Sequence, residues 1–155
     1  MSDPCAVAHG EEDERATGTR TLVAVFAGPV AEYLLKYGAD LGYRTVSYDP
    51  ADGALPTLGE DTDVVVTDHH REELGPVLRD VLARPVRWVG VMGNPRHPGP
   101  HVEALKQLGV APADIERVHR PVGLNIGSRT PPEIALATLA GLVADRNGRP
   151  GGFAF

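Results

Sequence analysis

Titratable and hydrogen-bonding side chains gather in a few short turns of this chain. The turn Thr67-Asp68-His69-His70 places an acid beside two histidines. An acid with imidazole neighbours can move protons or bind a metal ion, but adjacent residues point in different directions, so at most two of them can converge. We expect Thr67, His69 and His70 to contact a polar ligand, and we expect no metal ion here. The alternative is that Asp68 caps a following helix.

The turn Gly93-Asn94-Pro95-Arg96-His97 carries donors of a different kind. The planar guanidinium fork of Arg96 can grip a phosphate group. Gly93 and Asn94 can bring backbone and amide donors beside it. We expect Gly93, Asn94 and Arg96 to contact a ligand. The alternative is that Arg96 is only an exposed loop charge.

Segment 121–135 is the most unusual stretch of the sequence. Within it, two glycines bracket an apolar–polar–apolar triplet, and Thr130 and Glu133 have the spacing of a capping box that begins a helix. Backbone N–H groups of such a loop and helix start can bind an anion. A plain structural turn is the alternative. The residues that we expect to contact a ligand here are Gly123, Asn125, Gly127 and Ser128.

The first turn of the chain resembles a degraded dinucleotide fingerprint. The fingerprint needs three glycines at fixed spacing, but positions 26–31 keep only Gly28, and Phe26 stands where the first glycine belongs. We interpret it as a Rossmann turn that has lost pyrophosphate binding. Asp49 follows about 20 residues later, where an acid would meet a ribose hydroxyl, or it starts a turn before a proline. Gly28 and Asp49 remain candidate cofactor contacts.

Strand-like and helix-like segments alternate between these turns. Apolar, β-branched runs predict strands, and apolar residues at helical spacing predict helices between them. The strands fall at 21–26, 44–48, 63–67, 86–92 and 117–119. This alternation predicts an α/β fold: a three-layer, Rossmann-like, doubly wound parallel sheet with strand order 3-2-1-4-5. Ligands bind beyond the carboxyl ends of such strands, so all five turns are expected to meet at one edge.

Length and composition limit the remaining possibilities. A chain of 155 residues corresponds to one domain, and a formal net charge of −6 argues against a non-specific nucleic-acid binder. No apolar run approaches the roughly 18 residues of a membrane span. With a single cysteine, Cys5, and no secretory signal, we expect a cytoplasmic protein. The expected organisation is an acidic tail at 1–20, a Rossmann-like domain at 21–145 and a Gly/Pro-rich tail at 146–155.

Five motifs, in the same order along the chain, resemble the carboxyl-terminal Rossmann-like domain of the XdhC/CoxI family. They are the Gly28-Pro29-Val30-Ala31 turn, Asp49, the Val-rich strand that runs into His70, segment 89–96 and segment 121–135. The resemblance runs from about Leu22 to Val143. The chain departs from the family pattern at Phe26, Asn94, Asn125 and Pro132, and we expect the family's usual amino-terminal domain to be absent.

The resemblance implies an accessory role for molybdenum hydroxylases such as xanthine dehydrogenase. Family members bind the molybdenum cofactor, a phosphate-bearing pterin also called molybdopterin, protect it during sulfuration and deliver it. The resemblance therefore implies a non-catalytic cofactor chaperone, with a hydroxylase and a cysteine desulfurase as partners. An NAD(P)- or nucleotide-dependent oxidoreductase and a cofactor-free docking scaffold are the alternatives. A homodimer is expected as the commonest oligomer.

Overall fold

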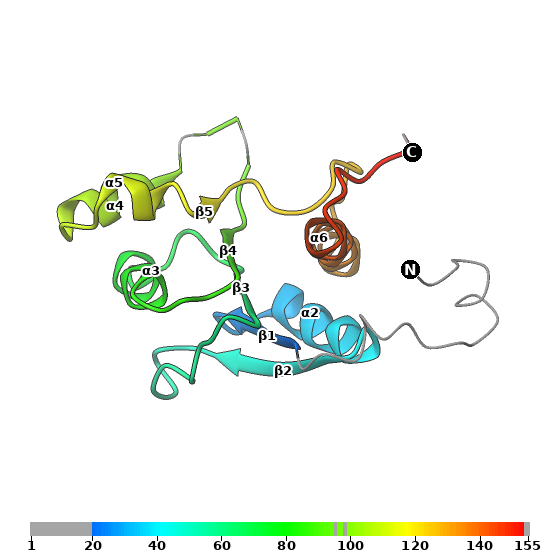
Figure 1. The fold of residues 1–155 in the computed structure, drawn as a ribbon, viewed down its shortest axis with the longest axis horizontal. Helices are drawn as coiled ribbons and strands as arrows, with labels where there is room; N and C mark the ends of the chain where they lie inside the picture. Colours follow the sequence, from blue (N-terminus) through cyan, green and yellow to red (C-terminus); the bar gives the residue numbers. More distant parts are fainter. Residues whose placement is uncertain (1–19, 95, 98, 154–155) are drawn as a thin grey trace.

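The computed structural model describes residues 20–94, 96–97 and 99–153. Cys5 and the predicted acidic tail, except Arg20, lie outside these residues. The described chain forms a five-stranded parallel sheet between two layers of helices (Figure 1). The predicted fold class, a three-layer Rossmann-like sheet, is confirmed.

The sheet has the order β2-β1-β3-β4-β5, and every neighbouring pair is parallel. The strands are β1 (Arg20–Val25), β2 (Tyr43–Tyr48), β3 (Thr62–Val66), β4 (Trp88–Val91) and β5 (Val118–His119). The two edge strands therefore differ greatly in length, because β5 has two residues and β2 has six.

The predicted strand order 3-2-1-4-5 is wrong, because β3 pairs with β1 on the side opposite β2. The sequence contains a physical reason for this placement. All five residues of β3 are buried, as a central strand requires, whereas in β2 only Tyr43 is buried and the other residues are partly or fully exposed. The order 2-1-3-4-5 is the other common doubly wound arrangement. It puts the apolar strand inside the sheet and the mixed strand at its edge.

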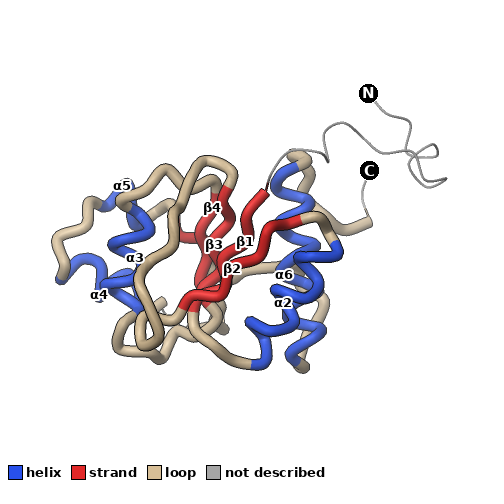
Figure 2. The backbone as a smooth tube through the Cα atoms, turned by 90° about the horizontal axis from the view of Figure 1, so that it is seen from below, coloured by secondary structure: helices blue, strands red, loops and turns tan. Residues whose placement is uncertain are grey.

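Helices cover both faces of the sheet (Figure 2). One face carries α2 (Pro29–Asp40) and α6 (Pro131–Arg146), and the other carries α3 (Leu74–Leu82), α4 (Pro100–Gln107) and α5 (Pro112–Ile115). Short α5 was not predicted, and α6 extends one residue into the predicted carboxyl-terminal tail. No helix in the described ranges is long and apolar enough to cross a membrane.

Alternation along the strands divides the core into two clusters. In β1, Val23 and Val25 pack with the α3 side, whereas Leu22 and Ala24 pack with the α2 and α6 side. Loop 49–61 between β2 and β3 contains no helix, and its buried Leu58 joins the first cluster. The loop thus covers part of the face that a crossover helix would otherwise cover.

A buried carboxylate ties the amino-terminal edge of the sheet to α6. Asp63 on β3 has no exposed surface. Its two oxygens accept hydrogen bonds from Tyr43 Oη at 3.1 Å, from Arg87 Nε at 2.6 Å and from Arg146 Nε at 3.1 Å. A buried charge is tolerated only when it is paired and hydrogen-bonded, and this one is satisfied by three elements at once. The cluster lies at the end of the sheet opposite the predicted site.

Candidate functional site

The turns after the first four strands lie at one edge of the sheet. Backbone hydrogen bonds continue the pairing just beyond the strands: Phe26 N to Tyr48 O at 2.8 Å, Thr67 N to Val25 O at 3.1 Å and Met92 N to Val66 O at 2.9 Å. The Thr67 hydroxyl adds a bond to Val25 O at 2.9 Å. The predicted meeting of these turns at the carboxyl edge therefore follows from the parallel register.

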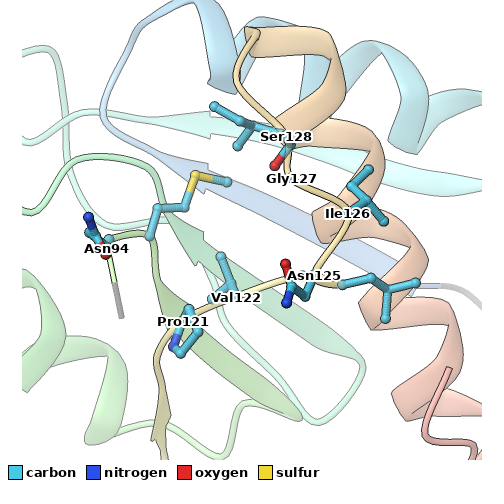
Figure 3. A pocket seen from close by; sticks show the side chains of 12 residues that line it. Asn94, Pro121, Val122, Asn125, Ile126, Gly127 and Ser128 are labelled. Atoms are coloured by element: carbon cyan, nitrogen blue, oxygen red, sulfur yellow. The ribbon is translucent and has the colours of Figure 1, made fainter. Parts of the chain in front are cut away.

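The cleft at this edge is confined to the ends of β4 and β5 and the start of α6. Its volume is about 550 Å³. Figure 3 shows Asn94 on one side and the run from Asn125 to Ser128 on the other. The lining residues are Met92, Gly93, Asn94, Pro121, Val122, Gly123, Leu124, Asn125, Ile126, Gly127, Ser128 and Ile134.

Two fixed points hold the glycine-bracketed wall of the cleft. At one end, Leu124 N donates to Ala137 O on α6 at 3.0 Å, and the preceding Gly123 lies directly against the backbone of that helix. At the other end, Thr130 caps α6: its hydroxyl accepts from Glu133 N at 3.4 Å and lies 2.7 Å from the Glu133 carboxylate. The predicted Thr130 cap is confirmed, but the Glu133 carboxylate meets the Thr130 hydroxyl rather than its backbone N–H, so the reciprocal bond of a capping box is not formed. The wall between these points is held without help from its own polar side chains.

The polar groups between Leu124 and Thr130 make few hydrogen bonds within the described parts of the chain. No hydrogen bond within the described parts of the chain uses the Asn125 amide, the Ser128 hydroxyl or the backbone N–H groups of Asn125, Gly127 and Ser128. Gly127 has φ 69°, a left-handed conformation that glycine adopts without steric cost. A short run of free N–H, hydroxyl and amide groups beside a cleft is suited to hydrogen-bonding a polar or anionic ligand.

Asn94 presents a donor from the opposite wall. Its Oδ1 accepts a hydrogen bond from Arg96 N at 2.9 Å, so the amide oxygen is already used by the turn. The side-chain amino group then remains for a ligand. The guanidinium of Arg96 is outside the cleft lining, and the residue is exposed.

The two histidines stand beside the cleft rather than in its lining. Their rings are tilted, with centroids 4.0 Å apart. Burial, His70 and Arg120 lower the pKa of His69, and a hydrogen bond with the backbone of Met92 opposes them. Asp68 Oδ1 accepts from His70 N at 2.8 Å, and α3 begins only at Leu74, so Asp68 does not cap that helix. The described residues contain no cluster of three metal-binding side chains.

The β1–β2 end of the edge is filled by side chains. Phe26 is 1% exposed and has φ 71°, the backbone conformation that suits the glycine expected there. The guanidinium of Arg71 lies 4.5 Å from its ring centroid. Arg71 also forms a bidentate pair with Asp49, at 2.9 and 3.1 Å.

Asp49 has no free oxygen for a ribose hydroxyl. Besides Arg71, Ala27 N donates to Oδ2 at 3.2 Å and Ala51 N donates to Oδ1 at 3.0 Å. Gly28 is the N-cap residue of α2 and is not among the residues that line the cleft. The geometry at this end of the edge therefore gives little support to dinucleotide binding.

The Asp49 pair predicts a pH-dependent stability. Hydrogen bonding from Arg71 is the main reason that the pKa of Asp49 falls from 3.8 to about 2. Since the folded-state pKa is depressed, the stabilisation is present above the unfolded-state pKa and is lost as the pH falls through the folded-state value. We expect Asp49→Asn to lower the free energy of unfolding by about 2 kcal/mol at neutral pH, and by less as the pH falls from about 4 to about 2.

Urea denaturation of both proteins across this pH range measures the difference. Asp52→Asn, at an exposed neighbouring position, is the matched control and should change the free energy of unfolding by at most about 0.5 kcal/mol at each pH. If the difference in free energy of unfolding between Asp49→Asn and the parent protein stays constant with pH, the pair with Arg71 does not lower the pKa of Asp49.

The structure brings half of the predicted binding residues together. Six line the cleft: Gly93, Asn94, Gly123, Asn125, Gly127 and Ser128. Six do not: Gly28, Asp49, Thr67, His69, His70 and Arg96. All twelve remain predictions as ligand contacts. Sequence reasoning missed the apolar lining, although most of it lies inside the segment already singled out. It also missed Arg71 and Arg120, for which no local pattern was available.

Comparisons with known proteins agree with this architecture. An uncharacterized protein of Escherichia coli K12, YqeB, is 33% identical over 106 residues, which cover 68% of this chain and 19% of YqeB. A crystal structure described as that of a xanthine dehydrogenase from Bacillus halodurans matches with a TM-score of 0.67 at 22% identity, over 88% of this chain and 45% of that chain. At this identity the likeness concerns the fold, and the chain spans less than half the length of either protein.

A family model described as the XdhC Rossmann domain matches residues 22–142. The match includes every strand after the first two residues of β1 and all of the cleft lining. It ends within α6, four residues before the end of that helix. The chain therefore belongs to the XdhC family through its Rossmann domain.

Proposed function

We propose that this chain is an accessory protein for the maturation of molybdenum hydroxylases of the xanthine dehydrogenase type. In this proposal it binds the molybdenum cofactor and delivers it as a non-catalytic chaperone. The observation that carries the proposal is the cleft of about 550 Å³, one wall of which is the glycine-bracketed segment typical of the family. The similar Bacillus halodurans structure, described as a xanthine dehydrogenase, adds support for a link to this class of enzyme.

The cleft has the size and chemistry of a binding site for a small heterocycle. Ligand sites commonly have volumes of about 300–1,000 Å³ and combine apolar walls with a few polar groups. Here Val122 and Ile134 supply apolar surface, and the amides of Asn94 and Asn125 supply donors and acceptors from opposite walls. Such amides can read the nitrogen- and oxygen-bearing edge of a pterin.

The free donors of the 125–128 run suit the phosphate of the same ligand. The Ser128 hydroxyl and the backbone N–H groups of Gly127 and Ser128 lie just before the start of α6. The partial positive charge at a helix start favours an anion there. None of the described lining residues carries an ionisable side chain, and this composition supports binding over acid–base catalysis.

The proposed partner is a molybdenum hydroxylase that receives the cofactor. A cysteine desulfurase that sulfurates the cofactor and a homodimeric state belong to the same proposal. The cleft is open at the carboxyl edge, so a carried ligand could pass to a partner without unfolding of the chain.

Anaerobic titration of the protein with molybdenum cofactor tests the proposal. We expect binding at micromolar protein, measured as molybdenum retained after equilibrium gel filtration. The double variant Asn94→Ala/Asn125→Ala should weaken binding by at least about tenfold, since each lost hydrogen bond contributes about 1 kcal/mol. Asn147→Ala, at an exposed position just after α6, is the matched control and should bind like the parent protein.

Two outcomes would overturn the proposal. The first is that the parent protein retains no molybdenum at micromolar concentration. The second is that the double variant binds as well as the control, because the ligand would then lie elsewhere. Thermal protection by NAD or NADP in the same buffer would instead support the oxidoreductase alternative.

A further inference from the structure

One arginine connects the two walls of the cleft. Arg120 lies between β5 and Pro121, the first residue of the glycine-bracketed wall. Its side chain contacts the turn that follows β4. There Nη1 donates to His97 O at 2.8 Å and Nη2 donates to Asn94 O at 3.2 Å. A single guanidinium therefore fixes the turn that presents Asn94 to the cleft.

The guanidinium packs directly against the backbone of Gly93. A Cβ atom added at Gly93 would lie 2.4 Å from Nη2 and 2.5 Å from Nε of Arg120, closer than real contacts allow. Gly93 itself lines the cleft. Arg120 itself is outside the lining of this cleft, but its guanidinium lies against the backbone of a residue that lines it.

The charge of Arg120 is not balanced by a carboxylate. Five other arginines form ion pairs: Arg71, Arg79, Arg87, Arg117 and Arg146. Arg120, in contrast, donates only to carbonyl oxygens, and no carboxylate of the described residues lies within 4.0 Å of it. Its Nε is buried and has no hydrogen-bond partner within the same ranges. A cation without a paired carboxylate adds positive potential to the neighbouring cleft.

Two nearby histidines respond to this cation. Burial is the main reason that the pKa values of His69 and His101 fall, and Arg120 lowers both further. For His69, His70 acts in the same direction and Asp68 opposes it. The imidazoles are thus disposed to be neutral beside Arg120, and they leave its positive charge dominant on this side of the cleft.

We propose that Arg120 is a positioning residue for the candidate site, and that its uncompensated charge strengthens the binding of an anionic ligand in the cleft. The charge component of this inference rests on the proposed function. The positioning component does not, because it concerns contacts within the chain.

Binding measurements on three variants test the charge component. Arg120→Met should weaken anaerobic binding of molybdenum cofactor by about tenfold or more and should flatten its dependence on salt. Arg120→Lys keeps the charge and should recover most of the affinity at low salt. Arg117→Met is the matched control: Arg117 also donates to two carbonyl oxygens, Leu82 O at 3.0 Å and Arg84 O at 3.3 Å, but lies outside the cleft lining. It should bind like the parent protein.

Amide hydrogen exchange tests the positioning component without a ligand. His97 N donates to Asn94 O at 3.1 Å, and Arg96 N donates to Asn94 Oδ1. Arg120→Met should speed exchange at these two amides by about tenfold, whereas Arg117→Met should leave their exchange rates unchanged.

Unchanged exchange rates in Arg120→Met would overturn the positioning component. Parent-like affinity and salt dependence in that variant would overturn the charge component. If the parent protein does not bind the cofactor, the proposed function and the charge component both fail. The hydrogen-exchange measurement still tests the positioning component in that case.

Discussion

Replacing Asp63 by alanine is expected to lower the free energy of unfolding by about 3–5 kcal/mol. The carboxylate is fully buried, and it is the shared acceptor of Tyr43, Arg87 and Arg146. Its removal would leave Arg146 without its ion-pair partner, whereas Arg87 would keep only its pair with the more exposed Asp145. Breaking a buried pair by deleting one partner costs more than the pair itself contributes, because the remaining charges stay desolvated.

Urea denaturation at neutral pH measures this loss. Asp80→Ala is the matched control, because Asp80 pairs with Arg79 at 3.2 Å but is 53% exposed. Exposed pairs contribute at most about 1 kcal/mol, so the control should remain close to the parent protein. If Asp63→Ala does not fold, Asp63→Asn provides a second comparison, since it keeps one acceptor oxygen. A loss below about 1 kcal/mol in Asp63→Ala would show that water or relaxation replaces the carboxylate.

The fold class could be predicted because its determinants are local. Apolar strands, helical spacing and short turns alternate along the sequence, and right-handed crossovers then lead to a parallel sheet. The strand order could not be settled by the same reasoning, because both common doubly wound orders satisfy those rules. The feature that distinguishes the two orders is the continuous burial of β3, which its Val64-Val65-Val66 run indicates.

The glycine-bracketed wall could be predicted for a similar reason. A helix cap and glycines at special backbone positions are properties of a few adjacent residues. Asp49 shows the limit of this reasoning. From the sequence, it was equally a ribose ligand and a turn residue. Which of the two roles Asp49 takes depends on Arg71, which is 22 positions away and donates to both carboxylate oxygens of Asp49.

Other long-range hydrogen bonds follow the same rule. Arg120 and Asn94 are 26 positions apart, and Arg146 and Asp63 are 83 positions apart. No spacing in the sequence connects such pairs, because tertiary packing alone brings them together. The sequence thus located the cleft but did not predict what holds it in shape.

The substitution Gly123→Ala is the second change with a large expected effect. Gly123 has φ 87°, where an alanine costs about 1–2 kcal/mol. An added Cβ would also lie 2.8 Å from the carbonyl carbon of Ala137 and 2.9 Å from Thr138 N, both on the backbone of α6. A helix backbone cannot yield as a flexible side chain can, and such overpacking costs about 1–3 kcal/mol. We expect a combined loss of about 2–4 kcal/mol in the free energy of unfolding.

Gly127→Ala separates the two contributions to this loss. Gly127 belongs to the same wall and has φ 69°, but nothing lies within 4 Å of its added Cβ. It should therefore lose only the backbone cost of about 1–2 kcal/mol. The difference between the two variants in urea denaturation isolates the contact with α6. If the two losses are equal, Gly123 is not pressed against the helix, and the wall of the cleft is not fixed at this end. If Gly123→Ala loses more, as expected, the close approach of loop and helix fixes this end of the cleft wall.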